Sequence, residues 1–318
     1  MGLLVNGEWH DQWYDTESTG GHFVRQESQF RHWITKDGQP GPTGDGGFKA
    51  EPGRYHLYIS YACPWASRVL MMRTLKGLED MISISIVHPH MLEHGWTFHD
   101  YPGVIKDPVI NADYMYEIYT HVDSNYSGRV TVPVLYDLKQ DTIVNNESSD
   151  IIRMLTRAFD DLGAKEGDYY PEELRSEIDK MNDFVYPNIN NGVYKTGFAT
   201  EQSVYEEEVH HVFDALDKLE AHLEHHNYLV NDQFTEADIR LFTTLVRFDK
   251  VYFGHFKCNI RQLVDYPKLW EYTRRIYHIP GIKETVNFDH IQQHYYYSHK
   301  TINPNGIVPV GPDLDFSL

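Results

Sequence analysis

One cysteine of this sequence, Cys63, has the surroundings of a reactive thiol. It stands in residues 61–66 (YACPWA), after an apolar run that predicts a strand and before a stretch with helical spacing. Pro64 suits the first position of a helix, so we expect Cys63 to be the N-cap, with its sulfur near the unpaired backbone N–H groups. Those groups and the helix dipole favour the thiolate, which is the nucleophilic form of cysteine.

The spacing of the cysteines predicts chemistry with one protein thiol. A dithiol oxidoreductase places its second cysteine three residues after the first, and that position is Ala66 here. The other cysteine of the chain, Cys258, lies in the second half of the sequence. A lone thiol needs an external small thiol to complete a redox cycle. We therefore expect Cys63 to be essential and Cys258 to be dispensable.

Three further features predict a site for a small peptide-like thiol. Val132 precedes Pro133 at the start of a predicted strand, where a cis bond is frequent and would expose the Val132 backbone for pairing with a ligand. Ser148 and the backbone N–H groups at a predicted helix start suit a carboxylate, and Glu147 suits an ammonium group. Arg129 supplies a cation for an anionic ligand. Placed around one thiol, these groups describe a glutathione site.

The first half of the chain has the pattern of a thioredoxin-like domain, which would position these groups. Residues 55–60 predict a strand, residues 66–78 a helix and residues 81–88 a second strand, so this part is a βαβ unit. A polar, aromatic-rich insertion follows at residues 89–128. Two more strands and a helix are then predicted, at residues 131–137, residues 141–145 and from residue 147 onward. The order β-α-β, then β-β-α, is that of a thioredoxin-like domain.

The second half is predicted to be all-helical. Its apolar residues recur with helical spacing in four segments, which are residues 172–185, 201–226, 236–253 and 267–277. Thr235 is a candidate N-cap, and Asp238 takes the place of the usual Glu or Gln of a capping box. We expect an N-terminal extension at residues 1–50, a thioredoxin-like domain at 51–165 and a helical domain with a C-terminal tail at 166–318.

Composition excludes several classes of function. The 318 residues include 28 Lys and Arg against 47 Asp and Glu, and the resulting charge of −19 disfavours binding to nucleic acid. No apolar run is long enough to cross a membrane, and no nucleotide-binding or zinc-protease motif occurs. The histidine-rich stretches at residues 88–94 and 210–226 are expected to be polar surface rather than metal ligands. Two cysteines without a secretory signal suit a cytoplasmic protein, and we expect no metal and no nucleotide cofactor.

Nearly the whole chain resembles the glutathionyl-hydroquinone reductases, also called Xi-class glutathione transferases. The resemblance rests on the following segments: residues 61–66 (YACPWA), 94–96 (HGW), 127–133 (SGRVTVP), 145–149 (NNESS), 191–195 (NGVYK), 294–299 (HYYYSH) and 302–312 (INPNGIVPVGP). The resemblance implies a thioredoxin-like domain followed by a helical glutathione-transferase domain, and a homodimer. It also implies that Cys63 removes glutathione from S-glutathionyl-hydroquinones through a mixed disulfide, which a second glutathione then resolves.

The same resemblance implies roles for individual residues. Contacts to glutathione fall on Trp96, Arg129, Val132, Glu147 and Ser148. A tyrosine that acts on the quinol falls on Tyr194, and Tyr295 and Tyr296 are expected as walls of the substrate pocket. A phenol that is neutral near pH 7 suits the delivery of a proton to the ring carbon that loses sulfur.

Two other functions fit the same residues. An omega-like thiol transferase or dehydroascorbate reductase would share Cys63 but would not need the tyrosine-rich tail. A non-catalytic ligand-binding protein could use the same scaffold, because a fold does not guarantee an activity. Turnover of a glutathionyl-hydroquinone, compared with turnover of mixed disulfides, separates these possibilities.

Overall fold

The computed structural model describes residues 2–318, which form two compact units. The first unit comprises residues 2–13, Gln26–Gly167 and Thr285–His290, and the second comprises Tyr14–Arg25, Asp168–Glu284 and Ile291–Leu318. Each unit is therefore built from three separate stretches of chain. The N-terminal extension predicted at residues 1–50 is divided between the units, which differs from a simple series of domains along the sequence.

A four-stranded sheet forms the centre of the first unit. Its order is β4-β3-β6-β7, with bounds β3 Tyr55–Ile59, β4 Ile82–Ile86, β6 Val134–Asp137 and β7 Thr142–Asn145. Strand β3 pairs in parallel with β4 and antiparallel with β6, and β6 pairs antiparallel with β7. Helix α1, Pro64–Leu75, makes the crossover that the parallel pair requires. This is the predicted thioredoxin-like arrangement.

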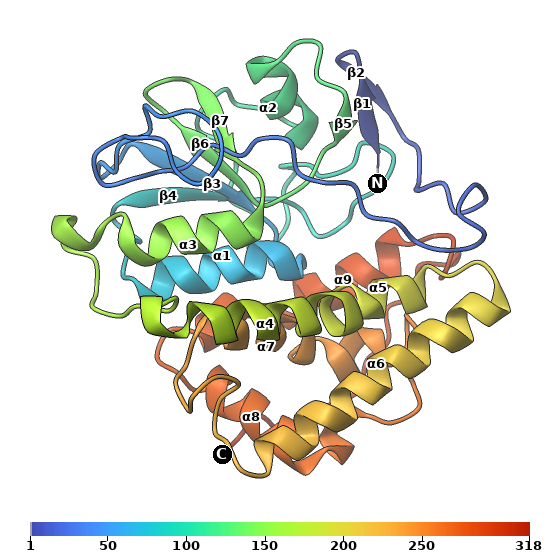
Figure 1. Cartoon of the computed structure of the whole chain (residues 1–318). Helices are drawn as coiled ribbons and strands as arrows, with labels where there is room; N and C mark the ends of the chain where they lie inside the picture. The colour runs from blue at the N-terminus through green and yellow to red at the C-terminus, as the bar shows by residue number, and fades with distance from the viewer. Residues whose placement is uncertain (1) are drawn as a thin grey trace. The chain divides into compact units, whose positions relative to one another are not determined.

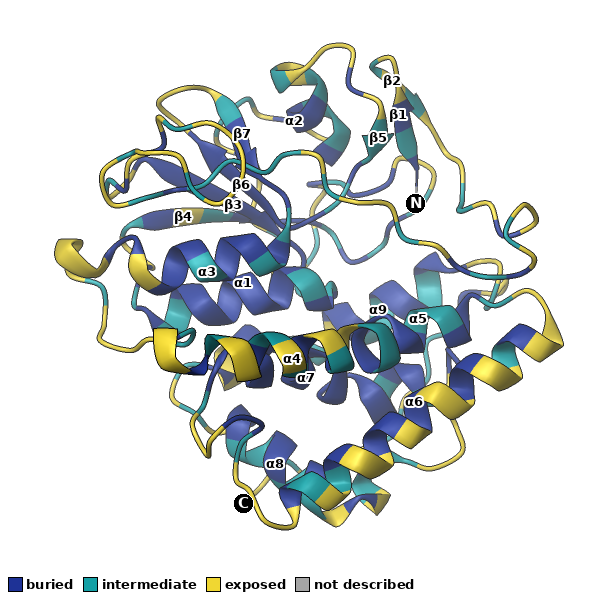
Figure 2. Ribbon diagram, in the orientation of Figure 1, coloured by how far each residue is buried: buried dark blue, intermediate teal, exposed yellow. Residues whose placement is uncertain are grey.

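Helices cover the sheet of the first unit. Helix α1 and helix α3, Ser148–Arg157, lie side by side along one face of the sheet (Figure 1). All five residues of β3 are buried, and α1 is buried along most of its length, as the dark blue ribbon shows (Figure 2). The predicted insertion also contains a helix, α2 Met115–Val122, which the sequence pattern did not reveal.

The start of the chain forms a second, smaller sheet in the first unit. Strand β1, Leu3–Val5, pairs antiparallel with β2, Glu8–His10, and with β5, Gly128–Arg129. Strands of two or three residues are too short to produce a periodic pattern, so the sequence did not predict them. This pairing fastens the N-terminal segment to the chain that leads into Val132.

The second half of the chain is helical, as predicted. Its α-helices are α4 Arg175–Val185, α5 Gly192–Gly197, α6 Gln202–Leu223, α7 Glu236–Leu245, α8 Pro267–Tyr277 and α9 Phe288–Ser298. Short helical turns lie before and between them, at η1 Asp160–Leu162, η2 Glu172–Leu174, η3 Tyr186–Asn190, η4 Phe248–Tyr252, η5 Leu263–Asp265 and η6 Lys283–Thr285. Among residues 2–318, no helix is both long enough and apolar enough to cross a bilayer.

Helix α7 is the buried core of the second unit. All ten of its residues are buried, whereas α6 exposes one side along its length (Figure 2). The predicted capping box is confirmed, because Thr235 accepts a hydrogen bond from Ala237 N–H and Asp238 accepts one from Thr235 N–H. The helix predicted at residues 236–253 is not continuous, since α7 ends at Leu245 and the chain resumes as the π-helical turn η4.

Candidate functional site

Cys63 is the N-cap of α1, as the sequence predicted. Its backbone is extended, with φ −74° and ψ 118°, and Pro64 is the first helical residue. The thiol is half-buried and donates a hydrogen bond to the carbonyl of Val132, with 3.4 Å between sulfur and oxygen. Ala66, in the place of a second cysteine, is fully buried. The structure thus brings Cys63 to Val132, which the sequence analysis had placed around this thiol.

The Val132–Pro133 peptide bond is cis, in agreement with the sequence expectation. Val132 is 4% exposed, and its carbonyl receives the Cys63 thiol. Within residues 2–318, no protein group accepts a hydrogen bond from the Val132 N–H. A buried N–H group without an acceptor is costly, so this donor suits a ligand that carries a carbonyl group.

Glu147 is the N-cap of α3, and hydroxyl groups hold its carboxylate. The N–H and the hydroxyl of Ser149 donate to Oε1, each at 3.0 Å, and the hydroxyl of Ser28 donates to Oε2 at 3.2 Å. Burial acts to raise the pKa of Glu147, but the two bonds from Ser149 and the nearby Arg68 and Arg31 outweigh it and lower this pKa. The carboxylate is therefore anionic at neutral pH and suits an ammonium group.

Two arginines around this carboxylate were not found by the sequence analysis. Arg68 is 2% exposed, its guanidinium lies 4.5 Å from the centre of the Trp65 ring, and it donates to the Ser148 hydroxyl at 3.4 Å. Arg31 forms a two-pronged pair with Asp150, with 2.5 Å from Nε to Oδ2 and 3.0 Å from Nη2 to Oδ1. An arginine immediately before an apolar helical run was a visible signal for Arg68, whereas nothing in the sequence pointed to Arg31.

Arg129 has a structural task that the sequence did not predict. Its guanidinium donates to the main-chain carbonyls of Gln12 and of Trp13, the latter at 3.0 Å. Arg129 therefore anchors the N-terminal segment to β5, three residues before Val132. Trp96 is buried in the insertion, where its carbonyl accepts a hydrogen bond from Met115 N–H at the start of α2.

In the second unit, Tyr194 belongs to a chain of three phenols. The hydroxyl groups of Tyr194 and Tyr295 are hydrogen-bonded, and the hydroxyl of Tyr252 lies 2.9 Å from that of Tyr295. Tyr295 is 1% exposed, and burial raises its pKa well above the usual value. Tyr296 is separate from this chain, because its hydroxyl donates to the carbonyl of Lys250. Tyr252 was missed, since one more tyrosine in a tyrosine-rich sequence gives no signal.

Arg25 places a cation over the phenol of Tyr194. The carbon of its guanidinium lies 5.0 Å from the ring centre, and its Nε donates to the side chain of Asn191 at 3.2 Å. The segment that brings Arg25 here, Tyr14–Arg25, is the part of the predicted extension that belongs to the second unit.

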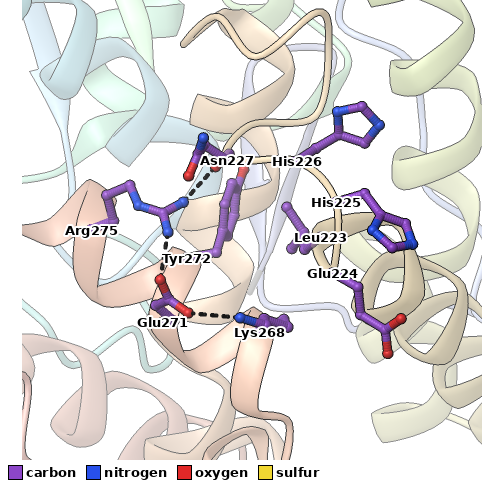
Figure 3. A pocket seen from close by; sticks show the side chains of 9 residues that line it. All are labelled: Leu223, Glu224, His225, His226, Asn227, Lys268, Glu271, Tyr272 and Arg275. Atoms are coloured by element: carbon purple, nitrogen blue, oxygen red, sulfur yellow. Dashed lines mark hydrogen bonds and ion pairs between the residues drawn. The ribbon is translucent and has the colours of Figure 1, made fainter.

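A pocket of about 190 Å³ in the second unit contains none of the predicted site residues (Figure 3). Three of its charged side chains pair with one another, because Glu271 accepts from Arg275 at 2.8 Å and from Lys268 at 3.3 Å. The Arg275 guanidinium also donates to the carbonyl of Asn227 at 2.7 Å. These ion pairs already satisfy these three charged groups of the pocket, so it is not a candidate for the reaction site.

The histidine-rich stretches have two different environments. His94 and His210 are exposed, as expected. His88 is half-buried instead, with its ring 4.8 Å from that of Tyr101 and 5.0 Å from that of His90, and burial lowers its pKa to about 4. Among residues 2–318, no three His, Cys, Asp or Glu side chains form a group that could hold a metal ion.

Comparison with known proteins identifies related sequences and structures. The family model "Glutathione S-transferase, N-terminal domain" matches residues 62–158, and its C-terminal counterpart matches residues 202–275. Glutathionyl-hydroquinone reductase YqjG of Escherichia coli K12 is 60% identical, covering 99% of this chain and 97% of the relative. A glutathione-bound structure of YqjG has a TM-score of 0.92 at 55% identity, with the same coverage.

Two further relatives agree with this similarity. Glutathionyl-hydroquinone reductase PcpF of Sphingobium chlorophenolicum is 55% identical, covering 98% of this chain and 96% of the relative. A Xi-class glutathione transferase from Natrialba magadii has a TM-score of 0.91 at 46% identity, covering 100% of this chain and 95% of that structure. The chain therefore belongs to the glutathionyl-hydroquinone reductases, the Xi class of the glutathione transferases.

Proposed function

We propose that this protein is a glutathione-dependent reductase that removes glutathione from S-glutathionyl-hydroquinones. The observation that carries the proposal is the place of Cys63, a half-buried thiol at the start of α1 with Ala66 where a dithiol enzyme has its second cysteine. Membership of the family, with relatives named glutathionyl-hydroquinone reductases, supports the same substrate class.

In the first half of the reaction, the Cys63 thiolate attacks the sulfur of the thioether. A sulfur–sulfur bond forms, and the bond between sulfur and the ring carbon breaks. A bare aryl carbanion is too unstable to leave, so the ring carbon is first protonated and the hydroquinone becomes its ketone tautomer. The electron pair of the broken bond then restores the aromatic ring as a hydroquinone oxyanion, which takes up a proton.

Tyr194 is the proposed donor of the proton to the ring carbon. Its phenol is half-buried and belongs to a hydrogen-bonded chain. A neutral phenol can protonate the ring carbon as a general acid, and the proton that the substrate hydroxyl loses returns to the Tyr194 phenolate. Tyr295, the buried neighbour of Tyr194, and Tyr296 are the proposed walls of the substrate pocket.

In the second half of the reaction, glutathione attacks the Cys63–glutathione disulfide. Oxidised glutathione leaves, and Cys63 returns to the thiolate. We assign the Val132 backbone to the peptide groups of glutathione and the Glu147 carboxylate to its ammonium group. The Ser148 hydroxyl at the start of α3 suits a carboxylate of glutathione. Trp96 and Arg129 complete the proposed glutathione contacts.

Intact-mass analysis tests this function directly. Mixing the protein with a glutathionyl-hydroquinone, without free glutathione, should add one glutathionyl group to the protein and release one hydroquinone. Cys258→Ser should form the same adduct, and Cys63→Ser should form none. An adduct that persists in Cys63→Ser, or hydroquinone release without any adduct in the wild type, would contradict the proposal.

We also propose that the enzyme is a cytoplasmic homodimer. Both of its cysteines are free thiols, which suits a reducing compartment. Sedimentation velocity at micromolar protein tests the oligomeric state, and a monomer at all concentrations would exclude the dimer.

A further inference from the structure

We infer that Tyr252 is a positioning residue for the proton donor. It acts through Tyr295 to stabilise the phenolate that Tyr194 becomes when it protonates the substrate ring. The inference rests on the proposed function, because it concerns the step in which Tyr194 gives up its proton. Tyr252 does not need to touch the substrate for this role.

The hydroxyl of Tyr295 determines which of the three phenols donate and which accept hydrogen bonds. Its hydroxyl lies between the hydroxyls of Tyr194 and Tyr252, and it has only one proton. It therefore donates to at most one of the two partners, and its oxygen accepts at least one of the two hydrogen bonds. Burial keeps Tyr295 protonated, since a phenolate is disfavoured at a site that is 1% exposed.

Proton transfer from Tyr194 leaves only one arrangement of the chain. A Tyr194 phenolate cannot donate, so Tyr295 donates to it. The Tyr295 oxygen is then the acceptor for the hydroxyl of Tyr252, which is 2.9 Å away. Donation by Tyr252 polarises the O–H bond of Tyr295, and hydrogen bonds in such a chain strengthen one another. Tyr252 therefore stabilises the developing Tyr194 anion indirectly, through Tyr295.

The surroundings of the chain suit a negative charge. The Arg25 guanidinium lies 5.0 Å from the centre of the Tyr194 ring. Arg247, which is fully buried, is close enough for its charge to favour a phenolate on Tyr295. Tyr252 itself is fully buried at the end of η4, where the helix after α7 is interrupted. The interruption thus carries a phenol into a set of three that has Arg25 over Tyr194 and the charge of Arg247 near Tyr295.

A double-mutant cycle tests whether Tyr252 acts through Tyr295. Tyr252→Phe should lower the rate on a glutathionyl-hydroquinone about three- to tenfold, and Tyr295→Phe should lower it further. The double variant should be no slower than Tyr295→Phe alone, because the path from Tyr252 to Tyr194 is already broken. Losses that multiply in full would overturn the inference.

Two further measurements separate positioning from a structural role. Reduction of a glutathione mixed disulfide needs no ring protonation, so Tyr252→Phe should keep its wild-type rate on that substrate. The alkaline limb of the pH–rate profile should move to higher pH in Tyr252→Phe, because the Tyr194 phenolate loses support. An equal loss on both substrates, or an unmoved pH profile, would contradict the inference.

Tyr266→Phe is the matched control. Tyr266 is also buried in the second unit, and its hydroxyl makes one hydrogen bond, to Asp217 at 2.9 Å. This variant should leave both rates and the pH profile unchanged.

Ultraviolet titration of tyrosinate in wild type, Tyr194→Phe and Tyr252→Phe tests the hydrogen-bonded phenols without any turnover. If the proposed activity fails but the Tyr194 phenol still titrates at a higher pH in Tyr252→Phe, the proposed function is wrong and the role of Tyr252 in the hydrogen-bonded phenols is retained. If Tyr194 titrates at the same pH in the wild type and in Tyr252→Phe, Tyr252 does not stabilise the Tyr194 phenolate and the inference is overturned.

Discussion

The two units of this protein place their reactive groups in opposite ways. In the first unit, Cys63 and Glu147 are the N-caps of α1 and α3, and Val132 directly precedes the proline before β6. Ends of elements leave backbone N–H groups for anions. In the second unit, Tyr295 and Tyr252 are fully buried and their hydroxyls are hydrogen-bonded to each other. The first arrangement favours ionised groups for sulfur chemistry, and the second keeps phenols neutral for proton transfer.

The two cysteines show the same contrast within one amino-acid type. Cys63 is half-buried at the start of a helix, and its thiol meets a carbonyl group. Cys258 is fully buried in the second unit, and burial raises the pKa of its thiol well above the usual value. The same side chain is therefore suited to attack in one place and inert in the other.

Exchanging cysteine for serine gives the largest expected effect. Cys63→Ser should lower the rate on glutathionyl-hydroquinones at least a thousandfold, roughly 4 kcal/mol, because a serine hydroxyl does not ionise near neutral pH. Cys258→Ser should keep the wild-type rate per folded molecule, measured alongside circular dichroism. Equal losses in the two variants would point to a dithiol mechanism and remove the contrast between the two sites.

Removing the phenol of the proton donor should separate the two kinds of chemistry. Tyr194→Phe keeps the ring and should cost about two to four powers of ten on glutathionyl-hydroquinones. Reduction of a glutathione mixed disulfide should survive, because it needs sulfur chemistry alone. Steady-state rates on both substrates check this, and parallel losses would leave the proton donor unassigned.

Neutralising the carboxylate at the start of α3 tests the ionic character of the first unit. Glu147→Gln keeps an acceptor for Ser149 and so keeps the helix cap, but it loses the charge proposed for the glutathione ammonium. Glutathione binding should weaken about ten- to a hundredfold, since charge-assisted hydrogen bonds contribute roughly 1.5–3 kcal/mol. Titration calorimetry measures the affinity, with the exposed Glu206→Gln as a control. Wild-type affinity in Glu147→Gln would exclude the assignment.

The smallest expected effect concerns acid stability. His56 is buried between the hydroxyls of Ser83 and Ser85, and burial lowers its pKa to about 4. The unfolded chain binds this proton near pH 6.5, so the free energy of unfolding falls as the pH drops from about 6.5 to about 4. Replacing His56 by Gln should reduce this slope by up to about 1.4 kcal/mol per pH unit. Urea unfolding between pH 5 and 7 measures it, and an unchanged slope would contradict the buried neutral imidazole.

Local signals account for the parts of the fold that the sequence predicted. The strands of the central sheet and the long helices follow the alternation or helical spacing of their apolar residues, and α8 begins and ends at the predicted residues 267 and 277. The segments missed were β1, β2 and β5, which have two or three residues each, α2 within the insertion, and α5 and α9 in the second half of the chain. Short strands are stabilised by pairing with segments that are distant in the sequence, so their own residues show no periodic pattern that predicts them.

The sequence by itself determined the character of Cys63, because an N-cap is made by neighbouring residues and by backbone groups within one turn. The same holds for Glu147 at the start of α3 and for the capping box at Thr235. Only the tertiary structure decided what surrounds them. Ser28 reaches Glu147 from more than a hundred residues away. The three phenols come from α5, η4 and α9, and adjacent residues of α9 point in different directions, so Tyr295 joins Tyr194 while Tyr296 does not. Such contacts depend on how buried helices pack, and no local pattern encodes them.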